Sequence, residues 1–317
     1  MNKILDHIFF LRPMLLLPLF SVIILGARLA EFGHGSSPFQ LGKLAELDFH
    51  LLLVLLSSAL VYCATFIYNQ VQDRKADQIN GRILFVSKEL VSVPTAYILI
   101  TVFSVAGLIL AFYSNTHVGV LLLIAFVIGM VYSHPKINFS ARSGKALWSN
   151  MFGAGMIPFL IGWAVVSDQI SVEAVFKSLS YLFAAGAIYL NSALLDKKGD
   201  AEVGKRTYAV IWTKDHLQTS ALLRTLVAAV LAQMSGDFPM LIVCLVTLPF
   251  LIRARLTHKE VHSATANKIA ILVISIMAVL YYPPFLLGAV VVFGATSLYY
   301  RYRFGIAFPS LKESTRQ

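Results

Sequence analysis

Long apolar runs separated by short polar segments dominate the chain. A helix that crosses the hydrocarbon core of a bilayer needs about 20 mostly apolar residues. Eight runs approach that length, near residues 13–30, 49–68, 91–113, 117–132, 149–166, 175–194, 216–234 and 238–256. The apolar stretch from Asn267 to Tyr300 is too long for one straight span, and Tyr281-Tyr282-Pro283-Pro284 within it interrupts helical hydrogen bonding. The pattern therefore predicts an all-α, polytopic transmembrane bundle of nine or ten spans around a central cavity.

Composition agrees with a membrane protein. Hydrophobic residues make up 58% of the chain and charged residues 13%, and the mean hydropathy is +0.75. A soluble protein of this composition would expose far too much apolar surface. No polar linker of useful length divides the chain, so we expect a single domain over residues 1–317. Cys63 and Cys244 both lie inside apolar runs, which suggests neither a disulfide framework nor a cysteine metal site.

Lysine and arginine gather in alternate loops. The amino terminus and the loops after the second, fourth, sixth and eighth runs hold most of them, whereas the other loops hold only Arg28, Lys43 and Lys177. The positive-inside rule then places the basic loops in the cytoplasm, and the basic carboxyl terminus favours an even count of spans. This bias and contact with anionic membrane lipids explain the net charge of +10. Because the basic residues are spread over separate short loops, no nucleic-acid partner is expected.

Two acidic segments stand at the ends of apolar runs on the predicted cytoplasmic side, and each contains Asp-x-x-x-Asp. On a helix this spacing brings both carboxylates to one face, where they can hold a hard divalent cation such as Mg²⁺. Ionisable groups near membrane depth are costly, so a functional role is their default explanation. The predicted catalytic and metal-binding residues are Asp73, Asp77, Asp196 and Asp200, with Asn69 as a further metal ligand.

Basic residues near these segments suit a phosphorylated substrate. A diphosphate bound to Mg²⁺ keeps exposed oxygens that lysine and arginine can neutralise. Such residues follow the first acidic segment, belong to the second, and occupy the loop after the fourth run. The predicted diphosphate-binding residues are Asn69, Arg82, Lys136, Arg142, Lys145, Lys205 and Arg206.

These motifs resemble those of the UbiA superfamily of intramembrane prenyltransferases. The family's first motif, Asn-Asp-x-x-Asp-x-x-x-Asp, is matched by Asn69, Asp73 and Asp77. Its second motif, an Asp-rich stretch that ends in Gly-Lys-x-Thr, is matched by Asp196, Asp200, Gly204, Lys205 and Thr207. The resemblance implies a Mg²⁺-dependent enzyme that ionises an allylic polyprenyl diphosphate and transfers the prenyl group to an acceptor.

Two positions depart from the family pattern. Gln70 stands where the family usually has a second acidic residue, and Ser192 and Ala193 occupy a stretch where many members place a further Asp. We therefore expect Mg²⁺ binding to depend on the four remaining aspartates and on the diphosphate itself.

Three functions remain open at this point. The first is transfer of the prenyl group to a lipophilic or aromatic acceptor, and the second is terpene cyclisation without an external acceptor. Aromatic residues in the spans, such as Tyr132 and Tyr189, can shield an allylic cation, although ordinary helix packing also explains them. The third is a cation-coupled transporter or lipid-binding membrane protein. A transporter site is expected in broken helices near the bilayer midplane, whereas these acids lie at span ends.

Overall fold

The computed structural model describes residues 2–32, 48–81 and 85–308, and within these ranges it consists of helices without any strand. The elements are α1 (Asn2–Phe10), α2 (Pro13–Phe32), α3 (Phe49–Gln72), α4 (Arg74–Ile79), α5 (Val93–Ser114), α6 (Thr116–Ser133), η1 (Phe139–Ala141), α7 (Ser143–Met151), η2 (Phe152–Met156), α8 (Ile157–Val166), α9 (Val172–Leu194), α10 (Lys197–Glu202), α11 (Tyr208–Ile211), α12 (Lys214–Ser235), α13 (Phe238–Thr257), α14 (Glu260–Tyr281) and α15 (Phe285–Phe304).

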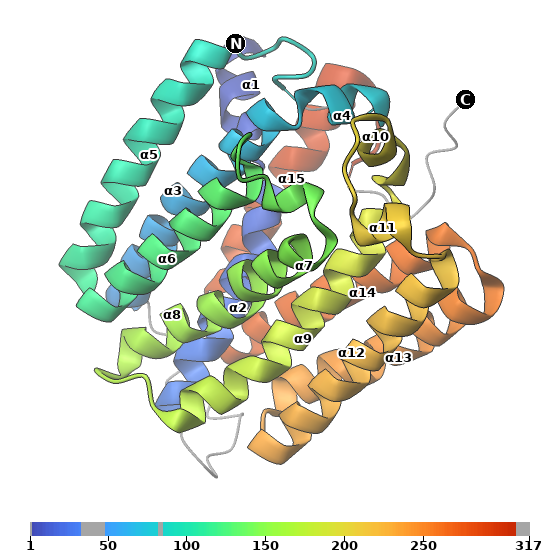
Figure 1. Cartoon of the computed structure of the whole chain (residues 1–317). Helices are drawn as coiled ribbons and strands as arrows, with labels where there is room; N and C mark the ends of the chain where they lie inside the picture. Colours follow the sequence, from blue (N-terminus) through green and yellow to red (C-terminus); the bar gives the residue numbers. More distant parts are fainter. Residues whose placement is uncertain (1, 33–47, 82–84, 309–317) are drawn as a thin grey trace.

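Nine helical segments of the described chain are long and apolar enough to cross a membrane. The 23-residue α9 is not among them, because its sequence includes Glu173, Lys177 and several serines. It nevertheless packs lengthwise against α12 and also contacts α14. With α9, the described residues contain ten segments of transmembrane length, which is the higher of the two predicted counts. Figure 1 shows α1 and the carboxyl-terminal end of α15 at the same end of the bundle as α4 and α10.

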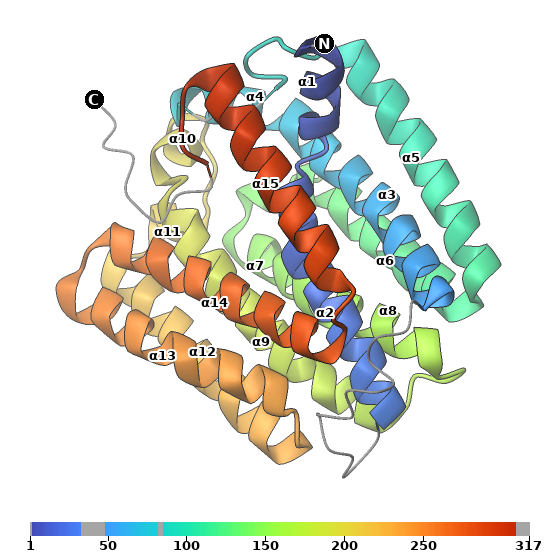
Figure 2. The same ribbon diagram turned by 180° about the vertical axis from the view of Figure 1, so that it is seen from behind.

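Two helix breaks occur where the sequence carries proline. The predicted interruption in the last apolar stretch divides it into α14 and α15, with Tyr282, Pro283 and Pro284 between them. Figure 2 shows both helices crossing the back of the bundle, where α15 lies beside α2. At the other terminus, α1 and α2 are separated by Leu11 and Arg12, and Pro13 begins α2. Proline suits this position because its missing N–H is not needed in the first turn.

The fifth span begins earlier than predicted. It runs from Ser143 to Val166 through α7, η2 and α8, whereas the apolar run alone predicted a start near residue 149. The prediction of Lys145 as a loop residue was therefore wrong, since Lys145 lies in the first turns of α7. Five residues in the middle, Phe152–Met156, adopt a π-helical turn.

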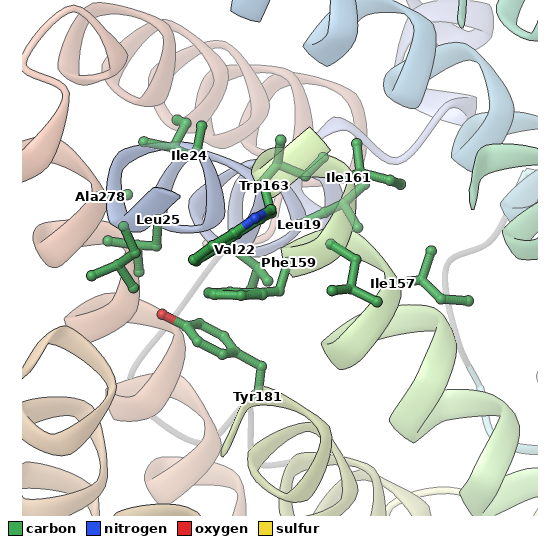
Figure 3. Close-up of a cluster of buried hydrophobic side chains, with 14 of the residues drawn as sticks. Leu19, Val22, Ile24, Leu25, Ile157, Phe159, Ile161, Trp163, Tyr181 and Ala278 are labelled. Carbon is green, nitrogen blue, oxygen red and sulfur yellow. The ribbon is translucent and has the colours of Figure 1, made fainter. Parts of the chain in front are cut away.

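Two glycines allow α2 and α8 to cross in close contact. A Cβ atom on Gly162 would lie 1.8 Å from the carbonyl oxygen of Ile23, and one on Gly26 would lie 2.2 Å from that of Phe159. Small residues at helix crossings let backbones approach in a membrane, where packing rather than the hydrophobic effect joins helices. Figure 3 shows the apolar cluster around this crossing, with Trp163 and Tyr181 beside Phe159.

A third glycine brings the two acidic segments together. The short helices α4 and α10 lie side by side at one end of the bundle (Figure 1). A Cβ atom on Gly199 would lie 2.5 Å from Nδ2 of Asn80 and 2.6 Å from the carbonyl oxygen of Ala76. The N–H of Gly199 donates a 2.8 Å hydrogen bond to Oδ1 of Asn80. Close packing and this hydrogen bond thus join the first acidic segment to the second.

Candidate active site

A polar cavity of about 180 Å³ lies between the two acidic segments. All four predicted aspartates line it, together with the predicted Asn69 and Lys205. The complete lining consists of Arg12, Asn69, Asp73, Ala76, Asp77, Asn80, Tyr132, Ser140, Asn150, Tyr189, Ser192, Ala193, Asp196, Asp200, Lys205 and Thr207. Residues from distant parts of the sequence thus form one site.

The first acidic segment crosses the junction between α3 and α4. The N–H of Asp73 donates to the carbonyl of Asn69 at 2.8 Å, and that of Asp77 donates to the carbonyl of Asp73 at 3.0 Å. The helical spacing therefore continues through the junction, as the Asp-x-x-x-Asp pattern predicts. Nδ2 of Asn69 donates to Oδ2 of Asp73 at 2.8 Å and to Oγ of Ser133 at 3.1 Å. Asn69 thus orients the Asp73 carboxylate.

The second acidic segment includes α10 and a tight turn after it. The N–H of Asp200 donates to the carbonyl of Asp196 at 3.0 Å, which again keeps the helical spacing. Gly204 has a φ of +77°, a conformation that glycine adopts without strain, and it reverses the chain. The N–H of Lys205 then donates to the carbonyl of Asp200 at 2.8 Å. The turn therefore directs the Lys205 side chain back over the carboxylates.

Lys205 bridges the two segments. Its Nζ lies 2.7 Å from Oδ1 of Asp73 and 3.5 Å from Oδ1 of Asp200. Burial lowers the pKa of Lys205, but the charges of Asp73 and Asp200 outweigh it, so the pKa lies above its usual value. Burial raises the pKa of Asp200, and the Lys205 charge opposes that rise. The cavity therefore already places a cation between one carboxylate of each motif.

The loop after α6 is fixed to the second segment by backbone hydrogen bonds. The N–H of Arg206 donates to the carbonyl of Ala141 at 2.9 Å, and the N–H of Ser143 donates to the carbonyl of Arg206 at 3.1 Å. Ser140 in this loop and Thr207 both line the cavity. The loop is thus part of the cavity wall through Ser140.

The other predicted diphosphate ligands within the described residues lie outside the cavity wall. Four of them are exposed and do not line it, namely Lys136, Arg142, Lys145 and Arg206. The ammonium of Lys145 lies 4.7 Å from the centre of the Phe139 ring instead. Arg82 lies outside the described residues. A role for these residues in diphosphate binding stays a prediction.

The carboxylates are arranged in pairs. Within residues 2–32, 48–81 and 85–308, no three His, Cys, Asp or Glu side chains are grouped closely enough to hold a metal ion by themselves. Protein Mg²⁺ sites that act on phosphates commonly use only one or two carboxylates, with waters and substrate phosphates completing the shell. The carboxylate and amide oxygens of this cavity fit that mode. The Lys205 ammonium, held between Asp73 and Asp200, shows that these carboxylates can bind a positive charge. The assignment of Asp73, Asp77, Asp196, Asp200 and Asn69 as Mg²⁺ ligands stays a prediction.

The two departures from the motif pattern differ in their consequences. Gln70 is buried, does not line the cavity, and donates from Nε2 to the carbonyl of Phe10 at 3.1 Å. The absence of a carboxylate at position 70 therefore does not change the charge of the cavity wall. Ser192 and Ala193 do line the cavity, so the second departure lies within the site.

Several lining residues were not among the predicted site residues. Arg12 reaches the cavity from the break between α1 and α2, where its φ is +57°. The Arg12-Pro13 pair before the first run was its only sequence signal. Asn150 lies in the fifth span, and a polar residue at that depth is itself a signal of function. Tyr132 and Tyr189, considered above as shields for a cation, also line the cavity.

The chain matches the UbiA prenyltransferase family over residues 19–274. No curated protein matches the sequence. Among solved structures, a UbiA homolog from Archaeoglobus fulgidus bound to GPP and Mg²⁺ has a TM-score of 0.64 and 19% sequence identity, with 87% of this chain and 99% of that chain covered. A UbiA homolog from Aeropyrum pernix K1 has a TM-score of 0.64 and 15% identity, with coverage of 83% and 94%. A digeranylgeranylglyceryl phosphate synthase structure has a TM-score of 0.62 and 16% identity, with coverage of 88% and 99%. At these identities the structures demonstrate a shared fold.

Proposed function

The chain belongs to the UbiA family of intramembrane prenyltransferases, and we propose that it ionises an allylic polyprenyl diphosphate with Mg²⁺ and transfers the prenyl group to a lipophilic or aromatic acceptor. The observation that carries this proposal is the convergence of both acidic segments, with Lys205, on one cavity at one end of the bundle. Structures of the Archaeoglobus fulgidus homolog with GPP or DMAPP and Mg²⁺ support the same substrate class and metal.

The aspartates and Lys205 have complementary roles in this proposal. Asp73, Asp77, Asp196 and Asp200 hold Mg²⁺, which neutralises charge on the diphosphate leaving group when bound. Lys205 lies within the same wall and can donate to a diphosphate oxygen. Arg12 lines the cavity from the break between α1 and α2. Its guanidinium supplies a second positive charge. The cavity thus has the charges needed to bind a diphosphate and stabilise its departure.

Loss of diphosphate leaves an allylic carbocation that must be kept from water. The cavity walls include Tyr132 from α6 and Tyr189 from α9, whose rings can stabilise a cation through their π faces. The surrounding helices are apolar and provide a medium in which an isoprenoid tail is soluble and water is scarce. An acceptor held near the cavity then captures the cation. We further propose that the cavity opens to the cytoplasm, as the distribution of basic loops favours.

Diphosphate release by purified protein in lipid vesicles tests this function. A ladder of prenyl diphosphates is supplied with Mg²⁺ or EDTA, with and without a membrane extract as acceptor source, and products are identified by mass spectrometry. We expect Mg²⁺-dependent release that Asp73→Asn and Asp196→Asn each reduce by about 100-fold or more. The matched control is Asp168→Asn, an exposed residue outside the cavity.

The products separate the remaining alternatives. A prenylated product that requires the extract identifies a transferase, whereas a hydrocarbon formed without extract identifies a cyclase. The absence of release from every prenyl diphosphate would contradict the proposed function and favour a binding or transport role.

A further inference from the structure

Lys205 occupies the position between the motifs that a metal would have to enter. Its ammonium contacts Oδ1 of Asp73 at 2.7 Å and Oδ1 of Asp200 at 3.5 Å. The Lys205 side chain is only 11% exposed, so water screens these contacts weakly. Both backbone anchors of this lysine, the Gly204 turn and the hydrogen bond to the Asp200 carbonyl, belong to the second motif. The backbone of Lys205 is therefore held in the second motif, while its side chain reaches across the cavity to the first motif.

The other oxygen of Asp73 is engaged as well. Oδ2 accepts from Nδ2 of Asn69 at 2.8 Å, while Oδ1 accepts from Lys205. A metal ion that binds Asp73 must displace at least one of these donors. Displacement of the ammonium leaves a nearly buried charge that needs another anionic partner, because an unpaired buried charge is costly. A diphosphate oxygen in the cavity would supply that partner.

We propose that Lys205 is a positioning residue that makes metal binding conditional on the substrate. Before substrate arrives, Lys205 pairs with Asp73 and Asp200 and disfavours binding of a free divalent cation. When the diphosphate enters, Lys205 transfers its hydrogen bonds to a diphosphate oxygen, and the two carboxylates become available to the metal. The metal and the diphosphate thus bind with positive coupling. This inference rests on the proposed function and deepens it by giving the order of events at the same site.

A purely structural role for Lys205 predicts the opposite effect on metal affinity. If the lysine only held the two motifs in place, its removal would loosen the cavity and weaken metal binding. If it competes with the metal, its removal strengthens metal binding as long as no diphosphate is present. Metal affinity without substrate therefore distinguishes the two roles.

Equilibrium dialysis of Mn²⁺ against the detergent-solubilised full chain measures this affinity. Inorganic pyrophosphate is either absent or present at equal concentration on both sides, so that excess metal in the protein chamber reports binding to protein. We expect the wild type to bind Mn²⁺ about tenfold or more tightly with pyrophosphate than without it. Lys205→Met is expected to bind Mn²⁺ alone about tenfold more tightly than the wild type, with most of the pyrophosphate coupling lost.

Three further variants control this experiment. Lys205→Gln removes the charge with a different side chain and is expected to behave like Lys205→Met, which guards against a folding defect in one variant. Lys205→Arg keeps the charge and should retain weak binding of free metal. Lys198→Met changes an exposed lysine of the same segment that does not line the cavity, and it should match the wild type.

The outcomes separate this inference from the proposed function. Metal affinity in Lys205→Met and Lys205→Gln that is equal to or weaker than in the wild type would overturn the role of Lys205, while pyrophosphate-dependent binding in the wild type would leave the proposed function standing. Absence of metal binding in every variant, with and without pyrophosphate, would overturn both.

Discussion

Asp237 is a buried acid that the proposed chemistry does not use. It lies in the short link between α12 and α13, away from the cavity, and is 0% exposed. Its Oδ1 caps α13 by accepting from the N–H of Met240 at 3.0 Å. Burial raises its pKa to about 6. The backbone N–H of Met240, the Tyr181 hydroxyl and the charge of Lys177 oppose the rise. The fold therefore favours the protonated form of this carboxyl group.

The raised pKa predicts how stability changes with pH. Between the ordinary pKa of 3.8 and about 6, the folded state holds more protons at Asp237 than the unfolded state. The contribution of this group to stability is therefore fully present below pH 3.8 and is lost as the pH rises through 6. Asp237→Asn keeps a capping oxygen without the charge, so we expect it to raise stability at pH 7.5 by about 1–3 kcal/mol.

Thermal unfolding in detergent from pH 4.5 to 7.5 measures this effect. The gap between the unfolding temperatures of Asp237→Asn and the wild type should widen with pH up to about 6 and then stay constant. Asp168→Asn changes an exposed carboxylate and should follow the wild-type curve. A constant gap over the whole range would show that Asp237 does not titrate in this window.

At the scale of single residues, the sequence predicts spacing better than pairing. The four aspartates were predicted because Asp-x-x-x-Asp is a local pattern, and the hydrogen bonds at Asp77 and Asp200 preserve it. Lys205 was predicted only as a diphosphate ligand. Its pairing with Asp73, 132 positions away, depends on how α4 meets α10, and no local pattern encodes that contact.

At the scale of elements, the packing of α4 on α10 should control activity. A Cβ atom on Gly199 would meet Nδ2 of Asn80 at 2.5 Å and the backbone of Ala76 at 2.6 Å, and the backbone atom cannot move aside easily. Overpacking of this kind costs about 1–3 kcal/mol. Gly199→Ala is therefore expected to separate the two motifs and to reduce prenyl diphosphate cleavage by about tenfold or more.

The matched control for Gly199 is Gly144, the second residue of α7, a helix that contributes Asn150 to the same cavity. A Cβ atom there would meet only the Tyr208 hydroxyl at 3.7 Å, an ordinary contact. Gly144→Ala should keep wild-type activity and unfolding temperature. Wild-type rates of diphosphate release in Gly199→Ala would contradict the claim that this contact positions the motifs.

Element boundaries were predictable where proline or a change of polarity marks them. The Pro283-Pro284 pair correctly predicts the break between α14 and α15, and the predicted apolar runs lie within helical segments except for Val91 and Ser92, which precede α5. The start of the fifth span was missed because Ser143, Gly144 and Lys145 are not apolar, although they continue the helix. The apolar pattern does not predict the π-helical turn at Phe152–Met156, which follows the cavity-lining Asn150 in the same span.

At the scale of the whole molecule, hydropathy gives the fold class, and the count stayed open only for the last apolar stretch, which the structure divides into α14 and α15. The helix α9 carries Glu173 and Lys177 near its start, which lowers its hydropathy, yet tertiary contacts bury Lys177. The Lys177 ammonium donates to the carbonyl oxygen of Ser235 at 2.5 Å and lies 3.7 Å from Oε1 of Glu173 one turn earlier, so α12 and a local ion pair together satisfy its charge. Contacts with a distant helix therefore accommodate a charge within a segment that its apolar run already predicts as a span.

Ten spans give a prediction about sidedness that the site itself does not give. An even number places the amino terminus and the end of α15 on one side, together with α4 and α10 (Figure 1). The segment between α8 and α9, which contains Gln169, then lies on the other side. The basic loops favour the cytoplasm for the end that carries the cavity. Single cysteines at these two ends should therefore react with a membrane-impermeant maleimide from opposite sides.

The experiment uses Lys198→Cys and Gln169→Cys, both exposed positions, in a chain whose buried Cys63 and Cys244 are replaced by serine. In right-side-out vesicles, Gln169→Cys should be labelled at once and Lys198→Cys only after permeabilisation, because the proposed topology places α10 on the interior side. Inverted vesicles should reverse the result, and the cysteine-free chain should stay unlabelled in both. Labelling of both positions from one side would rule out the ten-span arrangement, since α9 would then fail to cross the membrane. Labelling of Lys198→Cys from outside alone would keep ten spans but place the cavity, and the diphosphate that it is proposed to bind, on the exterior.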